Sequence, residues 1–198
     1  VPEDCLKEQL GKKRDSSNEY IASMGIYIFD AKAMEVALNN DKTDFGKEII
    51  PDVTKTMPVA SYLFDDFWED IGTIKAFYDT NLDLATINPK FNFYDEKMPI
   101  YTHRRHLPAT KANFCNISNS LTSEGCIITE CKLNKSGIGV RSIIENGTEL
   151  DGVIMMGADY YDTTVEKEAY KDKNQPVTGI GKNCKIANTI IDKNARIG

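Results

Sequence analysis

The sequence contains no apolar run near the ~20 residues that a membrane-spanning helix requires, and no excess of basic residues. Its 30 acidic residues outnumber its 24 basic ones, so the net charge is −6 at pH 7. A chain with this balance has no overall positive field to attract nucleic acid or an anionic membrane surface. We therefore expect neither nucleic acid nor a membrane among its partners.

The cysteines follow neither the common zinc pattern nor the disulfide pattern. There are five of them, they form no C-x-x-C pair, and one is left over after pairing. A structural zinc site needs closely spaced ligands, and a disulfide framework needs an even set. We expect reduced, mostly buried thiols of an intracellular protein, at Cys5, Cys115, Cys126, Cys131 and Cys184.

Residues 1–96 alternate between short apolar runs and helical patterns, which indicates an α/β arrangement. The apolar runs at 21–29 and 59–64 are typical of buried strands. Because two strands are too few for a complete sheet of this kind, residues 1–96 are expected to be the C-terminal part of a larger domain.

Three helices are predicted in this part of the chain. Asp30 can cap a helix that ends at Asn39-Asn40, and Asp44 can cap a second helix, which Pro51 should interrupt. The third helix follows Gly72 and places apolar side chains on one stripe, at Ile74, Phe77, Tyr78, Leu82 and Ala85.

Residues 97–112 are predicted to be a linker, and residues 113–198 have a different period. Apolar residues recur there every six positions, with glycine and asparagine between them, which is typical of a parallel β-helix built from hexapeptides. The segment Tyr160–Val177 interrupts the repeat and carries its own helical pattern, and the repeat is expected to be truncated at Gly198. The six-residue steps connect Ile127 with Leu133, Ile138 with Ile144, Leu150 and Met156, Ile180 with Ile186, and Ile191 with Ile197.

Four carboxylates surround the only tryptophan, directly after the apolar run at 59–64: Asp65, Asp66, Glu69 and Asp70. Open α/β sheets bind ligands at the carboxyl ends of their strands. Carboxylate oxygens suit Mg²⁺, which usually takes one or two of them together with substrate phosphates. The alternative is that Asp65, Asp66 and Glu69 are solvated surface charges.

Several segments are similar to glucose-1-phosphate adenylyltransferase (ADP-glucose pyrophosphorylase), and in particular to its plant and cyanobacterial type. Met155-Met156 and residues 93–95 favour the large-subunit type of that family. The matching segments are Ser23–Tyr27, Asp44-Phe45-Gly46 with Ile50-Pro51, Trp68–Thr73, Met156–Tyr161, Gly179–Asn183 and Ile191–Gly198.

The resemblance implies a fold and a reaction. Residues 1–96 would be the C-terminal part of a Rossmann-like nucleotidyltransferase domain, and residues 113–198 a left-handed β-helix. The family joins ATP and α-D-glucose 1-phosphate into ADP-glucose and pyrophosphate, for starch or glycogen synthesis. Its glycine-rich phosphate loop, first metal-binding aspartate and E-K-P lysine would all lie upstream of residue 1, so the chain alone is expected to be inactive.

The resemblance also implies roles for four residues. Asp70 matches a catalytic carboxylate that binds Mg²⁺, and Ser23 matches the serine that binds glucose 1-phosphate. Arg105 and Lys193 match the site for a phosphorylated effector or phosphate, although the neighbouring Arg104 leaves open which arginine faces the anion. The plainer alternatives are a strand-end hydroxyl for Ser23, a linker charge for Arg105 and a surface lysine for Lys193.

The family also implies partners and a compartment: a homo- or heterotetramer of like subunits in the plastid stroma, or alternatively the cytoplasm. A second hypothesis is a non-catalytic regulatory or assembly subunit of the same complex. A third is an acyltransferase on a hexapeptide β-helix, but such enzymes use a histidine between coils, and His103 and His106 lie in the linker. An enzyme acting on another sugar phosphate or nucleotide also fits the fold.

Overall fold

The computed structural model describes residues 22–198. The chain divides into two compact units, one that ends at Asp65 and one that runs from Asp66 to Gly198. Within the described residues, none of the helices combines the length and the apolar character that a membrane crossing needs. The predicted boundaries at residues 96 and 112 remain predictions.

The first unit contains three helical segments among its described residues: α2 (Ala31–Leu38), η1 (Phe45–Ile49) and α3 (Ile50–Thr56). The two predicted caps are confirmed. The Asp30 side chain accepts a hydrogen bond from the Lys32 N–H at 3.0 Å, and Asp44 accepts one from the Lys47 N–H at 2.8 Å. A small core joins the segments through Ala37, Ile49 and Val53, with Phe29, Phe45 and Met57 packed against them.

Two predictions for this region are wrong. Pro51 does not interrupt the second helix, because it lies in the first turn of α3, where its missing N–H is not needed. The predicted strands are also not found, since residues 22–29 and 59–64 have no strand structure. An apolar run becomes a strand only where a neighbouring strand pairs with it along its length.

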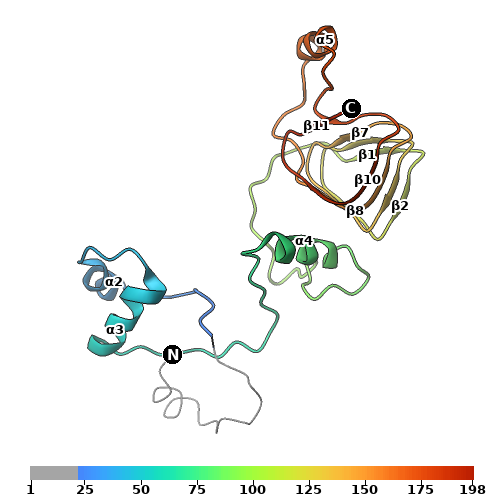
Figure 1. Cartoon of the computed structure of the whole chain (residues 1–198). Helices are drawn as coiled ribbons and strands as arrows, with labels where there is room; N and C mark the ends of the chain where they lie inside the picture. The colour runs from blue at the N-terminus through green and yellow to red at the C-terminus, as the bar shows by residue number, and fades with distance from the viewer. Residues whose placement is uncertain (1–21) are drawn as a thin grey trace. The chain divides into compact units, whose positions relative to one another are not determined.

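The second unit is a parallel β-helix (Figure 1). Its strands curl into stacked coils. Equivalent positions of successive coils lie 16 or 17 residues apart along the chain, except across the inserted segment, where Ile144 pairs with Ile180. One sheet has the order β1-β4-β7-β9-β11 and the other has the order β2-β5-β8-β6-β3, with β10 also paired to β8. The strands are β1 (Lys111–Asn113), β2 (Asn116–Ser118), β3 (Leu121–Thr122), β4 (Ile127–Thr129), β5 (Lys132–Asn134), β6 (Gly137–Ile138), β7 (Ile143–Ile144), β8 (Glu149–Met155), β9 (Gly179–Ile180), β10 (Lys185–Ile191) and β11 (Arg196–Ile197).

The strand β8 passes around a corner of the coil. It pairs with β5 through Glu149–Asp151 and with β6 through Ile154–Met155. Between these stretches lies Gly152, with φ +63°, a left-handed conformation that glycine adopts without steric cost. Asn119, Asn183, Asn188 and Asn194 also have positive φ, as is typical of asparagine in tight turns.

The apolar core fills the inside of the coils. Ile128, Ile144 and Ile180 are stacked in one ladder through β4, β7 and β9, and all three are at most 2% exposed. The predicted repeat is therefore confirmed, but its register differs at two positions. Ile127 is 40% exposed and Met156 is 37% exposed, because their neighbours Ile128 and Met155 point inward instead. Steps of five residues, such as Ile128 to Leu133, occur together with steps of six, such as Ile138 to Ile144.

Hydroxyl groups in the core complete the hydrogen bonding between coils. Ser136 and Thr148 are fully buried, and each accepts a bond from a backbone N–H of the next coil, Val153 to Ser136 at 3.1 Å and Cys184 to Thr148 at 3.2 Å. Thr148 also donates to the Gly181 carbonyl at 2.7 Å. Within the described residues, no buried side-chain nitrogen or oxygen lacks a partner, as expected since such a group would destabilise the fold.

Two helices flank the β-helix in this unit. The helix α4 (Ile74–Asp83) packs on β8, where the Tyr78 hydroxyl donates to the Gly152 carbonyl at 2.6 Å. The helix α5 (Thr164–Asp172) lies in the segment that interrupts the repeat and stands outside the coils, as predicted (Figure 1). Thr163 and Glu166 form a capping box at its start.

We predict that Ile144→Ala destabilises the β-helix by about 2–5 kcal/mol, because it removes a fully buried side chain and leaves a cavity between stacked coils. The free energy of unfolding can be measured by urea denaturation, followed by hydrogen exchange of the strand amides. The control is Val165→Ala on α5, where the side chain is 74% exposed and a change within about 0.5 kcal/mol is expected. Equal effects of the two substitutions would contradict the assigned core.

Candidate functional site

The Asp70 turn connects the acidic segment to α4. One Asp70 carboxylate oxygen, Oδ1, accepts a hydrogen bond from the Gly72 N–H at 3.0 Å, which forms an Asx turn. Thr73 then caps α4 by accepting from the Ala76 N–H at 3.1 Å. The Asp70 side chain is exposed, so the turn presents a carboxylate to solvent just before the helix begins.

The residues around Asp70 fit a metal ion only in part. Within residues 22–198, no three His, Cys, Asp or Glu side chains converge in a way that could hold a metal. Asp66 uses one oxygen to accept from the Phe67 N–H at 2.7 Å. Since Mg²⁺ takes one or two carboxylates plus substrate phosphates, Asp70 can contribute one ligand but is not a complete site.

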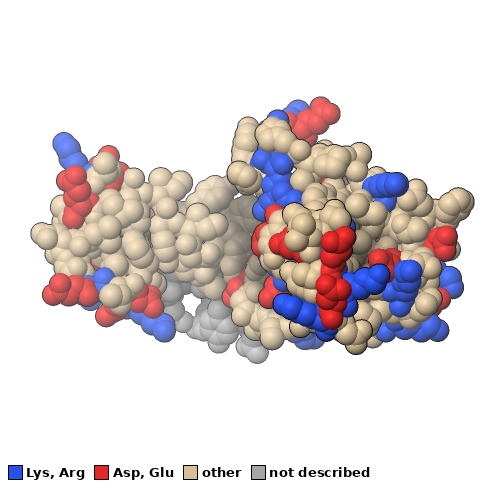
Figure 2. All heavy atoms as spheres, turned by 90° about the horizontal axis from the view of Figure 1, so that it is seen from above, with Lys and Arg blue, Asp and Glu red and all other residues tan. Residues whose placement is uncertain are grey.

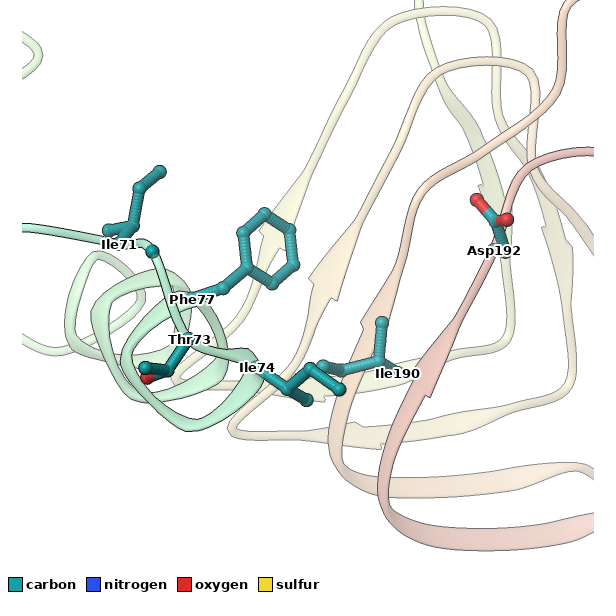
Figure 3. Close-up of a pocket in the computed structure, with 7 residues that line it drawn as sticks. Ile71, Thr73, Ile74, Phe77, Ile190 and Asp192 are labelled. Atoms are coloured by element: carbon teal, nitrogen blue, oxygen red, sulfur yellow. The ribbon is translucent and has the colours of Figure 1, made fainter. Parts of the chain in front are cut away.

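A shallow groove of about 490 Å³ lies beside the Asp70 turn. Figure 3 shows Ile71, Thr73, Ile74 and Phe77 on one side of it and Ile190 and Asp192 of the β-helix on the other. Most of the lining is apolar, and Ile74 is 81% exposed. The groove therefore offers apolar contact area, with Asp192 as its one charged lining group.

Ser23 belongs to the first unit. Its hydroxyl oxygen accepts a hydrogen bond from the Gly25 N–H at 3.2 Å and lies 3.1 Å from the Tyr27 hydroxyl. Gly25 has φ +73°, so the chain turns directly after Ser23. The side chain is exposed and able to donate to a ligand while the backbone holds it in place. It does not lie at the start of a strand, contrary to the prediction.

Lys193 is held by a carboxylate from another part of the chain. Its ammonium group lies 2.9 Å from Asp159 Oδ1, and the neighbouring Asn194 amide donates to Asp159 Oδ2, also at 2.9 Å. The Asp159 N–H in turn donates to Asn194 Oδ1 at 2.9 Å. Asp159 and Lys193 are 34 residues apart in sequence but lie side by side because the coils stack.

Arg105 lies in the same region of the second unit. The linker that carries it is fixed where the Gly125 N–H donates to the Pro108 carbonyl at 2.8 Å. Tyr161, two residues after Asp159, donates to the Gly125 carbonyl at 2.7 Å. The charge of Arg105 is the smallest of the causes that lower the pKa of the Asp159 carboxyl. Arg105 and Lys193, the two residues predicted to bind an anion, therefore lie in the same region of the second unit.

These neighbours change the acidity of Asp159. The hydrogen bonds from Lys193 and Asn194 hold the pKa of its carboxyl below the usual range, and the charges of Lys193 and Arg105 act in the same direction. The sequence does not single out Asp159. It lies in the segment Met156–Tyr161, but no sequence pattern shows that it faces Lys193 across the inserted segment.

A second polar cluster, also missed from the sequence, anchors the segment that carries α5. Asp162 is 6% exposed and accepts from the Thr178 N–H at 2.7 Å and the Thr178 hydroxyl at 2.9 Å. Arg196 lies 3.8 Å from Asp162 and donates to the Tyr170 hydroxyl at 2.5 Å. These contacts join the two ends of the segment to the last strand and to α5.

Charges of both signs lie next to one another on the face shown in Figure 2. This face therefore shows no extended patch of a single sign. In the second unit, the Lys132 ammonium group also pairs with Glu149 of a neighbouring strand at 2.8 Å.

Comparison with known proteins places both parts of the chain. Residues 8–87 match the family model of nucleotidyl transferases, and residues 105–198 match the left-handed parallel β-helix domain named GLGC. A wheat protein (Triticum aestivum), glucose-1-phosphate adenylyltransferase small subunit, chloroplastic/amyloplastic, is 45% identical over 194 residues, which is 96% of this chain. The chain belongs to the glucose-1-phosphate adenylyltransferase family. The predicted fold class, part of a nucleotidyltransferase domain followed by a left-handed β-helix, is confirmed.

The match to this family has a defined extent. The chain spans 41% of the length of the wheat relative. That relative is named a small subunit, whereas Met155-Met156 and residues 93–95 favoured the large-subunit type, so the subunit type remains a prediction.

We predict that the Asp159 carboxyl titrates below the usual range for aspartate, and that Lys193→Ala returns its pKa toward that range. The folded-state pKa is the depressed one, so the stabilisation is present at neutral pH and is lost as the pH falls through it. Carboxyl chemical shifts in an NMR pH titration measure this directly. Lys182→Ala, which changes the same charge elsewhere on the β-helix, should leave the Asp159 titration unchanged; a normal Asp159 pKa in the unaltered chain would refute the pairing.

Proposed function

We propose that this chain is part of an enzyme that transfers the adenylyl group of ATP to α-D-glucose 1-phosphate. The sugar phosphate oxygen forms a bond to the α-phosphorus of ATP, and the bond from that phosphorus to the pyrophosphate leaving group breaks. The products are ADP-glucose, the sugar donor for starch or glycogen, and pyrophosphate. The support is the order of the two matched domains, together with the 45% identity to a relative that carries this name.

Asp70 is the proposed catalytic and metal-binding residue. Its turn holds Oδ1 on the Gly72 N–H and places the carboxylate in solvent, next to the apolar groove. When bound there with a second carboxylate and the phosphates, Mg²⁺ would neutralise phosphate charge. The chemistry otherwise depends on positioning, since phosphoryl-type transfers need aligned groups more than covalent catalysis.

Ser23 is the proposed contact to glucose 1-phosphate. Its oxygen is already oriented by the Gly25 N–H, so its hydroxyl hydrogen can be donated to a phosphate or sugar oxygen. The exposed side chain supports this role.

Arg105 and Lys193 are the proposed binding groups for phosphate or a phosphorylated effector. Arginine binds an oxyanion through two parallel N–H groups, and lysine acts as a point charge. The proximity of both cations to Asp159 supports a shared site. We further propose a homo- or heterotetramer of like subunits in the plastid, since the wheat relative is named as a chloroplastic/amyloplastic subunit.

We expect Asp70→Asn, in a protein that spans the full length of its relatives, to lower turnover at least about 100-fold, because it removes a ligand of the charge-neutralising metal. Turnover is measured as pyrophosphate release from Mg-ATP that depends on glucose 1-phosphate. Asp66→Asn, which changes the same charge four residues away, should change turnover by less than about threefold.

Near-normal activity of Asp70→Asn would refute its metal role. If the unaltered full-length protein released no pyrophosphate but changed the activity of a partner subunit, the regulatory or assembly hypothesis would replace the catalytic one.

The combined substitution Arg105→Ala and Lys193→Ala should weaken the response of the full-length protein to phosphate or a phosphorylated effector by about tenfold or more in concentration, while the rate without effector stays the same. The comparison is the activation or inhibition curve of each variant. Arg104→Ala is the matched control, since Arg105 is the arginine whose charge lowers the pKa of Asp159. An unchanged response of the double variant, or an equal loss in the Arg104 variant, would contradict the assignment.

A further inference from the structure

The cluster of Arg105, Lys193 and Asp159 contains a negative charge where an anion would bind. Asp159 Oδ1 receives the Lys193 ammonium group at 2.9 Å, and Arg105 acts on the same carboxylate. Both side chains of the ion pair are exposed, Lys193 by 42% and Asp159 by 49%, so the pair is open to an incoming ligand. An oxyanion that approaches Lys193 therefore competes with the Asp159 carboxylate, which is already in contact with the Lys193 ammonium group.

The Asp159 carboxylate is not required to hold the backbone at this point. The Asp159 N–H is bound to Asn194 Oδ1, and the Asn194 N–H donates to the Gly157 carbonyl at 3.0 Å. The Ala158 N–H donates to the Val140 carbonyl at 2.8 Å. These bonds fix the two chain segments without the carboxylate, so its charge can be removed while the frame remains.

The other nearby carboxylate is engaged differently. Asp192 accepts a hydrogen bond from the backbone N–H of Lys193 at 2.7 Å. This bond orients the turn and does not involve the Lys193 ammonium group. Asp159 is thus the described carboxylate that contacts the Lys193 side chain.

We propose that Asp159 is a built-in competitor for the anion site, which weakens the binding of phosphate and phosphate esters by occupying Lys193 until such a ligand displaces it. This rests on the proposed role of Arg105 and Lys193 in binding an effector. A phosphate dianion attracts the two cations more strongly than a single carboxylate charge does, so it can displace Asp159 from Lys193. Asp159 in this way sets the affinity of the site.

The test measures binding of inorganic phosphate to the 198-residue chain and to three variants, by NMR titration at constant ionic strength and pH. We expect Asp159→Asn to bind phosphate about five- to tenfold more tightly, because one repelling charge leaves an exposed, partly screened site. Asp151→Asn is the matched control: Asp151 is also exposed and also accepts from an asparagine amide, Asn134 Nδ2 at 2.8 Å, but it lies on β8. Its phosphate affinity should equal that of the unaltered chain.

Lys193→Ala separates the two proposals. If it abolishes phosphate binding while Asp159→Asn leaves the affinity unchanged or weaker, the anion site stands and the competitor role is overturned. If Lys193→Ala and the unaltered chain bind phosphate equally weakly, the anion site itself is refuted. If Asp159→Asn and Asp151→Asn both bound phosphate more tightly, the gain would result from the lower net negative charge of the chain. That outcome would also overturn the proposal. Titration with acetate, a monoanion, should show a smaller gain for Asp159→Asn than phosphate does.

Discussion

The stacking of parallel coils is the constraint on which the rest of the second unit depends. One coil cannot bury its own inner face, so each ladder of side chains must be covered by the next coil, as Ile128 is by Ile144 and Ile144 by Ile180. A slip of one residue would turn Ile128 outward and Ile127 inward in a whole strand, so the pairing register is strongly specified. The same register decides which polar residues on the outside become neighbours.

The inserted segment carries α5 without disturbing this register. The chain leaves the coils after Met156–Tyr161 and returns at Thr178, and the ladder continues directly from Ile144 to Ile180. Closing a longer loop adds little entropic cost, so the fold tolerates the excursion if its two ends are held together. The buried Asp162 holds them by accepting two hydrogen bonds from Thr178. Asp159 and Lys193 lie side by side because their coils stack, and the Asn194 N–H bond to the Gly157 carbonyl joins the two turns.

The sequence predicts local signals well and long-range partners poorly. The caps at Asp30 and Asp44, the helix after Gly72 and the β-helix repeat follow from residue type and spacing, and the structure confirms them. Of the strands expected at 21–29 and 59–64, neither forms within the described residues 22–29 and 59–64, because a strand depends on a paired neighbour that an apolar run does not specify.

In the candidate site too, the sequence shows individual residues but not their long-range partners. Arg105 and Lys193 could be chosen from motifs, but Asp159, the partner of Lys193, is 34 residues from it and separated from it by the insertion. A six-residue period likewise does not show that Ile128, and not Ile127, faces the core, since the coils mix steps of five and six residues. Only the observed pairing of coils resolves such choices.

A control site has to be empty under some conditions, which limits how strongly it can hold its ligand. A ligand shifts an equilibrium only by the difference in its affinity for two states, and a site that is always occupied transmits no signal. Two cations held close together without a counter-charge repel each other and bind any available anion. In the proposed site, the ion pair of Lys193 with Asp159 would stabilise the empty cluster, and Asp159 would lower the summed charge of the three side chains from +2 to +1. The free energy of the empty state is then part of what sets the ligand concentration at which the site responds.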